Sequence, residues 1–95
     1  MIRTAVLSLA LLSSPALAAS YYVAEPATQP AQQRFVARDN VWRCDAAGCT
    51  STRTASRPAI VCGSLVREVG ALRSFSVEGR AFDAEALQSC NSRAR

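Results

Sequence analysis

The sequence predicts a small, disulfide-stapled α+β domain with a two- or three-stranded antiparallel sheet and two helices on one face, in the order β-β-α-β-α. Residues 56–70 have the 3.6-residue periodicity of an amphipathic helix, whereas residues 34–44 and 72–78 are rich in strand-forming side chains. Four cysteines also stand in a chain of only 95 residues, which is too short for a large core. We therefore expect covalent cross-links to supply part of the stability.

The first 18 residues have the features of a signal peptide. Arg3 gives a positive start, residues 4–12 are an apolar run, and residues 16–18 (Ala-Leu-Ala) fit the small-x-small cleavage pattern, so we expect cleavage before Ala19. The alternative, an N-terminal membrane anchor, is disfavoured because the run is too short to span a bilayer. We expect a periplasmic or secreted protein with no transmembrane segment after cleavage.

The rest of the chain divides into a spacer at 19–33, one domain at 34–92 and a fraying tail at 93–95. Residues 24–33 hold two prolines and no large apolar side chain, so we expect them to be extended and mobile. Tyr21 to Val23 resembles a short edge strand. Within 34–44, the turn-prone residues 38–40 indicate either a bulge in one strand, which we favour, or a turn between two strands.

Two tight turns and two helices follow. Residues 45–48 form a turn in which Gly48 takes a positive φ, and residues 50–53 return as a strand. We expect a helix from an N-cap at Ser56 to a stop at Gly70, with Gly63 on the outer side. Its inward residues are Pro58, Val61, Cys62, Leu65, Val66 and Val69.

The third expected strand and the second helix lie after Gly70. Phe75 and Val77 alternate along residues 72–78 and should point inward, with Leu72 on the opposite side. Asp83 is the expected N-cap of the second helix, which runs to about residue 91. Phe82 and Leu87 form a hydrophobic staple at its start.

The even number of cysteines in a short exported chain is typical of a disulfide framework. Four cysteines allow three pairings. We favour Cys44–Cys49, across a tight turn, and Cys62–Cys90, between the two helices; loop entropy assigns them about 2 and about 3.5 kcal/mol. We expect Trp42 to pack over a disulfide in the core, the alternative being an exposed ring that stacks on a ligand.

All eleven cationic residues are arginines, and they are interleaved with seven acidic residues for a net charge of +4. A nucleic-acid-binding protein more often has a dense basic run or face, so we expect no nucleic-acid partner. We favour a mixed, solvated surface. The alternative is an anionic partner attracted at long range.

The residues offer little catalytic chemistry. The absence of histidine removes the commonest general base and most catalytic zinc sites. The cysteine spacing fits neither paired zinc knuckles nor the C-x-x-C redox motif. Asp83 with Glu85, or with Glu78, is better explained by helix capping and surface charge than by acid–base catalysis. We expect no catalytic, metal or cofactor site.

Trp42, Cys44 and Cys49 form a W-x-C-x4-C motif. The further positions that carry a resemblance are residues 57–62, Gly70, Phe75, Gly79, Leu87, Cys90 and Asn91. At these positions, within residues 35–91, the chain resembles a family of small uncharacterised exported proteins of alphaproteobacteria. The resemblance implies export and disulfides, and it carries over no catalytic or binding residue. Relatives are expected to have a Gly-rich break at residues 39–40, which leaves the choice between bulge and turn open.

These observations favour a non-enzymatic periplasmic binding or accessory protein of unknown specificity, with an envelope protein or an anionic envelope surface as the candidate partners. The first alternative is a thiol–disulfide redox protein that uses Cys44 and Cys49. The second is a protein that binds anionic envelope lipid or polysaccharide through its arginines.

Overall fold

The structure is a computed structural model that describes residues 20–95. The expected signal peptide and its cleavage point lie outside the described residues. The elements, in chain order, are β1 (Tyr22–Pro26), β2 (Arg34–Ala37), β3 (Asn40–Asp45), β4 (Gly48–Ser51), α2 (Pro58–Val69), β5 (Leu72–Val77), β6 (Arg80–Ala81) and α3 (Ala84–Asn91).

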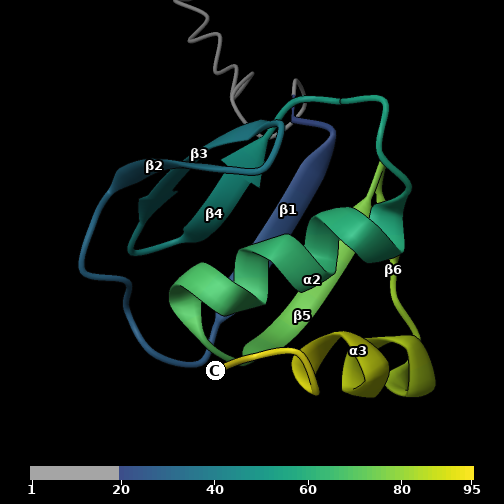
Figure 1. Cartoon of the computed structure of the whole chain (residues 1–95). Helices are drawn as coiled ribbons and strands as arrows, with labels where there is room; N and C mark the ends of the chain where they lie inside the picture. Colours follow the sequence, from purple (N-terminus) through teal and green to yellow (C-terminus); the bar gives the residue numbers. More distant parts are fainter. Residues whose placement is uncertain (1–19) are drawn as a thin grey trace, which may run out of the picture.

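The strands of the described chain form one antiparallel sheet in the order β2-β3-β4-β1-β5-β6, and both helices cover the same face of it (Figure 1). The α+β class and the two helices on one face are confirmed. The prediction of two or three strands is wrong, because the sheet has six. β1 and β6 have five and two residues, too few for hydrophobic alternation to define them, and a turn at residues 38–39 divides the strand expected at 34–44 into β2 and β3.

Strand β1 is central, although its first residues were expected at an edge and the rest in a mobile spacer. It pairs with β4 on one side and β5 on the other. Tyr22 and Ala24 point into the core and are each 1% exposed. Pro26 stands where the register with β5 shifts, a place where a strand tolerates a residue without an amide hydrogen. The proline that suggested a spacer therefore only ends the strand.

Residues 38–39 form a turn between β2 and β3, so the favoured bulge is wrong. Ala37 pairs with Asn40, and Arg38 takes a φ of 61°. Asn40 then lies buried: its Nδ2 donates to Ser51 Oγ (3.0 Å) and to Thr52 O (3.1 Å). Because a buried amide needs such partners, these bonds fix the end of the hairpin against β4 and the segment that follows it.

The next hairpin carries the first disulfide. Cys44 and Cys49 are directly paired residues of β3 and β4 and are bonded to each other, as predicted. Gly48 has the expected positive φ, at 136°, and a Cβ there would lie 2.7 Å from Ala24 O of β1. The returning strand begins at Gly48 and ends at Ser51, slightly earlier than predicted.

Helix α2 begins at Pro58, as the proline suggests, and Gly70 ends it with a φ of 88°. The predicted cap at Ser56 is wrong: Arg57 is the N-cap, and the Ser56 hydroxyl donates to Asp39 Oδ2 (3.2 Å). Of the predicted inward face, Pro58 is exposed and Val69 is half-buried. The buried apolar side chains of α2 are Val61, Cys62, Leu65 and Val66.

Strand β5 departs from simple alternation. Glu25 pairs with Ser74 and Pro26 with Leu72, so Arg73 is an extra residue. This irregularity lets both Phe75 and Leu72 face the core, and the prediction that Leu72 points outward is wrong.

The end of the chain packs onto the sheet and α2. Asp83 caps α3 as predicted, since its Oδ1 accepts from Ala86 N (2.8 Å), and Cys90 is bonded to Cys62. Beyond α3 the chain stays hydrogen-bonded, with Arg93 N donating to Cys90 O and Ala94 N to Asn91 O (both 3.0 Å). Ala94 packs against the core, so the end is a turn beside α2 and not a fraying tail (Figure 1).

Trp42 is fully buried in the core, together with both disulfides. The predicted place of Trp42 in the core is therefore confirmed, and its ring offers no exposed face to a ligand. The other large buried rings are Tyr22 and Phe75, with centroids 5.8 Å apart. These rings belong to the same core cluster as the buried side chains of α2.

Candidate functional site

The cysteines form structural bridges. Within residues 20–95 none is free, and the four sulfur-bearing residues are 0–5% exposed. Cys44 and Cys49 lie on adjacent strands and not in the first turn of a helix, the usual position of a redox-active C-x-x-C cysteine. Their side chains are buried, so the bridge offers little surface to a second thiol.

The acidic residues weighed as acid–base candidates have separate places. Asp83 is engaged in capping α3 and Glu85 lies in its first turn, while Glu78 stands in the β5–β6 turn with a φ of 51°. Across the described part of the chain, no three His, Cys, Asp or Glu residues come close enough to hold a metal ion.

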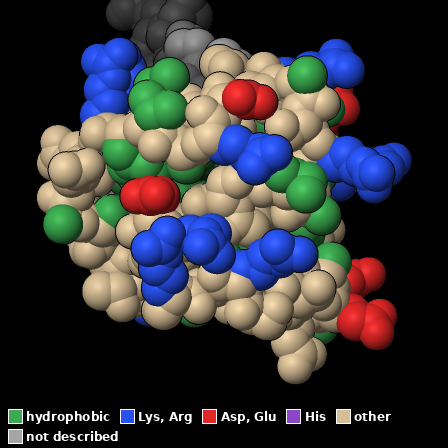
Figure 2. All heavy atoms as spheres, viewed as in Figure 1, with side chains coloured by type: hydrophobic (Ala, Val, Ile, Leu, Met, Phe, Trp, Pro, Cys, Tyr) green, Lys and Arg blue, Asp and Glu red, His purple; other side chains and the backbone are tan. Residues whose placement is uncertain are grey.

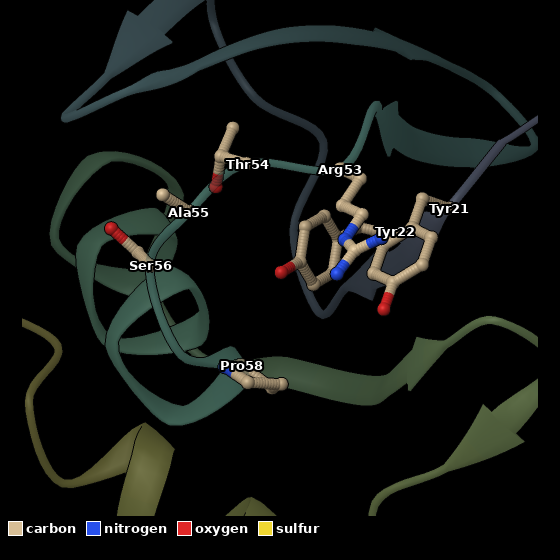
Figure 3. A pocket seen from close by; sticks show the side chains of 7 residues that line it. All are labelled: Tyr21, Tyr22, Arg53, Thr54, Ala55, Ser56 and Pro58. Carbon is tan, nitrogen blue, oxygen red and sulfur yellow. The ribbon is translucent and has the colours of Figure 1, made fainter.

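One hollow of about 480 Å³ lies between the start of β1 and the segment before α2 (Figure 3). We call it the tyrosine hollow; its lining residues are Tyr21, Tyr22, Arg53, Thr54, Ala55, Ser56 and Pro58. Figure 3 shows Arg53 and the two rings together on one side and the loop of Thr54 to Ser56 on the other. The guanidinium carbon of Arg53 lies 5.7 Å from the centre of the Tyr21 ring, so this cation already has an aromatic partner.

Burial raises the pKa of Tyr22 above its usual value, and the neighbouring Tyr21 raises it further. A hydrogen bond with Thr54 and the positive charge of Arg53 act in the opposite direction. Tyr22 therefore remains a neutral phenol at physiological pH. The tyrosine hollow is a polar surface with one cation, the hydroxyls of Thr54 and Ser56, and no acidic or histidine side chain in its lining.

A second hollow, of about 240 Å³, has three arginines in its lining. We call it the arginine hollow; its lining residues are Arg38, Ala59, Ile60, Gly63, Ser64, Arg67 and Arg93. The three arginines come from three separate segments: the β2–β3 turn, the last turn of α2 and the end of the chain. Each guanidinium presents several N–H donors in a plane that matches a phosphate or carboxylate.

Gly63 allows Arg93 to reach this position. A Cβ at Gly63 would lie 3.1 Å from Arg93 Cδ and 3.7 Å from its Nε, so the stem of Arg93 crosses α2 directly over the glycine. This contact also explains why Gly63 is buried, although the helical pattern places it on the outer side. Ser64, one residue further on, donates its hydroxyl to Ile60 O (3.0 Å), which leaves its oxygen as an acceptor only.

The three arginines of the arginine hollow form no salt bridge within residues 20–95. Asp39 and Glu68 are the sequence neighbours of Arg38 and Arg67, yet among residues 20–95 no carboxylate forms an ion pair with the three arginines. On the face that the helices cover, Figure 2 shows basic side chains gathered around α2, with acidic ones at the edges of the group. Like charges held around one concavity attract a small anion.

The sequence contains these three arginines but no signal that they meet. Arg38 and Arg67 are 29 residues apart in the chain and Arg67 and Arg93 are 26 apart, with other arginines and acidic residues in between. The sequence predicts a mixed, solvated surface for all of the arginines, and only the fold separates the clustered three from the rest. The Gly63 in the middle of an amphipathic helix was the one available clue, because glycine disfavours such a position.

Comparison with known proteins gives a family but no activity. The family described as "Family of unknown function (DUF8200)" matches residues 6–92. No curated protein and no solved structure matches the chain. In the part that the structure describes, neither helix is long and apolar enough to cross a membrane.

Proposed function

Since the chain belongs to the family of unknown function DUF8200, we propose its role from its own geometry: an exported, non-enzymatic protein that binds the anionic group of an envelope component. The group would be a phosphate or carboxylate of an anionic lipid or polysaccharide, and the arginine hollow would hold it. One observation carries the proposal: Arg38, Arg67 and Arg93 line one hollow, and no carboxylate among residues 20–95 forms an ion pair with them.

Two further features support this role. Two disulfides are consistent with an oxidising, exported location. The sequence has no histidine, so an acid–base catalyst that works near neutral pH is hard to assemble beside the arginines. Binding by three exposed cations without a deep cavity should be weak for a single small anion and stronger for a larger ligand with additional contacts.

The proposal can be tested with inorganic phosphate as the probe. We expect phosphate to shift the backbone amide NMR signals of Gly63, Ser64 and Arg93 in the oxidised protein. Arg67→Gln or Arg93→Gln should weaken the affinity about three- to tenfold, as expected for the loss of one charge-assisted contact at a solvated position. Raising the ionic strength from about 0.01 M to about 1 M should abolish the shifts, because the Debye length falls from about 30 Å to about 3 Å.

Arg73→Gln is the matched control. Arg73 is an exposed residue of β5 outside the arginine hollow, so this variant removes the same charge elsewhere. It should bind phosphate like the unaltered protein. Equal weakening in Arg73→Gln and Arg67→Gln would show that only net charge matters, and the proposed site would then be wrong.

A further inference from the structure

The arginine hollow adjoins an apolar groove between the two helices, because Ala59, Ile60 and Arg93 line both spaces. We call the second space the helix groove; it has a volume of about 300 Å³ and is lined by Ala59, Ile60, Phe82, Ala86, Ser89, Cys90 and Arg93. One surface therefore changes from cationic to apolar along the length of α2.

The helix groove keeps apolar side chains partly in water. Ile60 is 40% exposed, which makes it one of the large exposed hydrophobic residues, and Phe82 and Ala86 are half-buried on the opposite wall. The ring of Phe82 is held edge-on to Phe75, with centroids 4.8 Å apart, and the Cys62–Cys90 disulfide ties α2 to α3. Both walls are thus fixed to the core, and the groove exists before any ligand arrives.

We infer that the two spaces together bind one single-chain anionic amphiphile, such as a fatty acid. This inference rests on the proposed function and names its ligand class. The anionic head lies among Arg38, Arg67 and Arg93, and the hydrocarbon chain follows the helix groove past Ile60 and Phe82. Charge complementarity selects the head group, because these arginines have no carboxylate partner among residues 20–95.

The shape of the surface favours a single chain over the alternatives. A polysaccharide has no apolar segment to fill the helix groove. A membrane surface would meet several protruding apolar side chains, whereas in this groove only Ile60 is a large exposed one, and Phe82, Ala86 and Cys90 line a recess and are half-buried or buried. A hydrocarbon chain attached to an anion matches both parts at once.

A series of straight-chain carboxylates from butanoate to decanoate tests the inference. Each carboxylate is titrated into the oxidised protein below its critical micelle concentration, and its affinity is measured by isothermal titration calorimetry. Each methylene that leaves water for the groove should strengthen binding about two- to fourfold. Decanol, which has the chain without the charge, should bind at least about tenfold more weakly than decanoate.

Two variants test the binding of the anionic head and of the hydrocarbon chain separately. Arg67→Gln should weaken the binding of every carboxylate in the series by a similar factor. Ala86→Gln should flatten the dependence on chain length and leave butanoate and inorganic phosphate unchanged, because Ala86 lines the helix groove but not the arginine hollow. Glutamine is a good helix former, so this variant should fold, and far-ultraviolet circular dichroism will verify that it does.

The outcomes distinguish the two proposals. If phosphate and all carboxylates bind equally, whatever the chain length, the anion site stands and the amphiphile inference is overturned. If decanol binds as tightly as decanoate and Arg67→Gln has no effect, both proposals fail. Binding to anionic phospholipid vesicles without binding to monomeric decanoate would also overturn the inference, in favour of a membrane surface.

Discussion

Gly63 destabilises helix α2 but leaves room for the side chain of Arg93 on the helix surface. Glycine in a helix interior is about 1 kcal/mol less favourable than alanine. Its missing side chain, however, is what lets Arg93 cross α2, since a Cβ would lie 3.1 Å from Arg93 Cδ. The neighbouring atom belongs to a flexible, exposed side chain that can move aside. Gly48 differs, because its nearest neighbour is the backbone oxygen of Ala24, at 2.7 Å.

We therefore predict opposite effects of the same substitution at these two glycines. Gly63→Ala should raise the free energy of unfolding by about 0.5–1 kcal/mol, because helix propensity improves and Arg93 shifts. Gly48→Ala should lower it by about 1–3 kcal/mol, because alanine is strained at a φ of 136° and meets fixed backbone. Urea unfolding followed by circular dichroism measures both.

Gly63→Ala should also weaken phosphate binding, because the displaced Arg93 no longer faces the arginine hollow. A variant that is both more stable and a poorer binder would separate the two roles of this residue. Unchanged binding in Gly63→Ala would mean that Arg93 reaches the anion without crossing α2 at this point.

Asn91 joins α3 to the start of β5. Its Oδ1 accepts from Leu72 N (2.8 Å) and its Nδ2 donates to Leu72 O (3.0 Å), so one side-chain amide satisfies both backbone groups of a buried strand residue. Arg93 follows two residues later, which makes this clamp part of the geometry that holds the end of the chain beside α2.

Asn91→Ala should lower the free energy of unfolding by about 1–3 kcal/mol, because two part-buried backbone groups of Leu72 lose their partner. Urea unfolding gives the value. The control is Ser89→Ala on the same helix: Ser89 is exposed and its side chain makes no hydrogen bond within residues 20–95, so the change should stay within about 0.5 kcal/mol. Equal stabilities for the two variants would contradict the role of the clamp.

The whole molecule depends on its two disulfides to different degrees. Cys62–Cys90 closes a loop with a sequence separation of 28 residues and ties α2 to α3, whereas Cys44–Cys49 has a separation of 5 within one hairpin. Loop entropy assigns about 3.5 kcal/mol to the first and about 2 kcal/mol to the second. A small core supplies only about 3–5 kcal/mol.

Removing the long bridge by Cys62→Ala with Cys90→Ala should therefore leave the protein partly unfolded at room temperature, while Cys44→Ala with Cys49→Ala should stay folded with a lower urea midpoint. Near-ultraviolet circular dichroism of the buried Trp42 reports which pair has kept its tertiary packing. The reverse order of stability would contradict the loop-entropy argument.

Local patterns in the chain were sufficient for several elements. The helical periodicity of residues 58–69, the N-cap Asp83, the turn glycine Gly48 and both disulfide pairings are confirmed. Each depends on residues that are close in sequence or, for Cys62 and Cys90, on the inward faces of two recognisable helices. Steric and hydrogen-bonding preferences act over such short distances, so the residue types at neighbouring positions indicate the local structure.

No local sequence pattern identifies the centre of the sheet or the arginine hollow. Val23 of β1 lies beside Ser76 of β5, 53 residues away in the chain, and strand pairing at this separation depends on how the whole core packs. The meeting of Arg38, Arg67 and Arg93 likewise follows from a hairpin turn, a helix and the end of the chain docking on one core. Charged surface residues carry no periodicity that records their neighbours in space, so only the folded arrangement shows where the uncompensated charge lies.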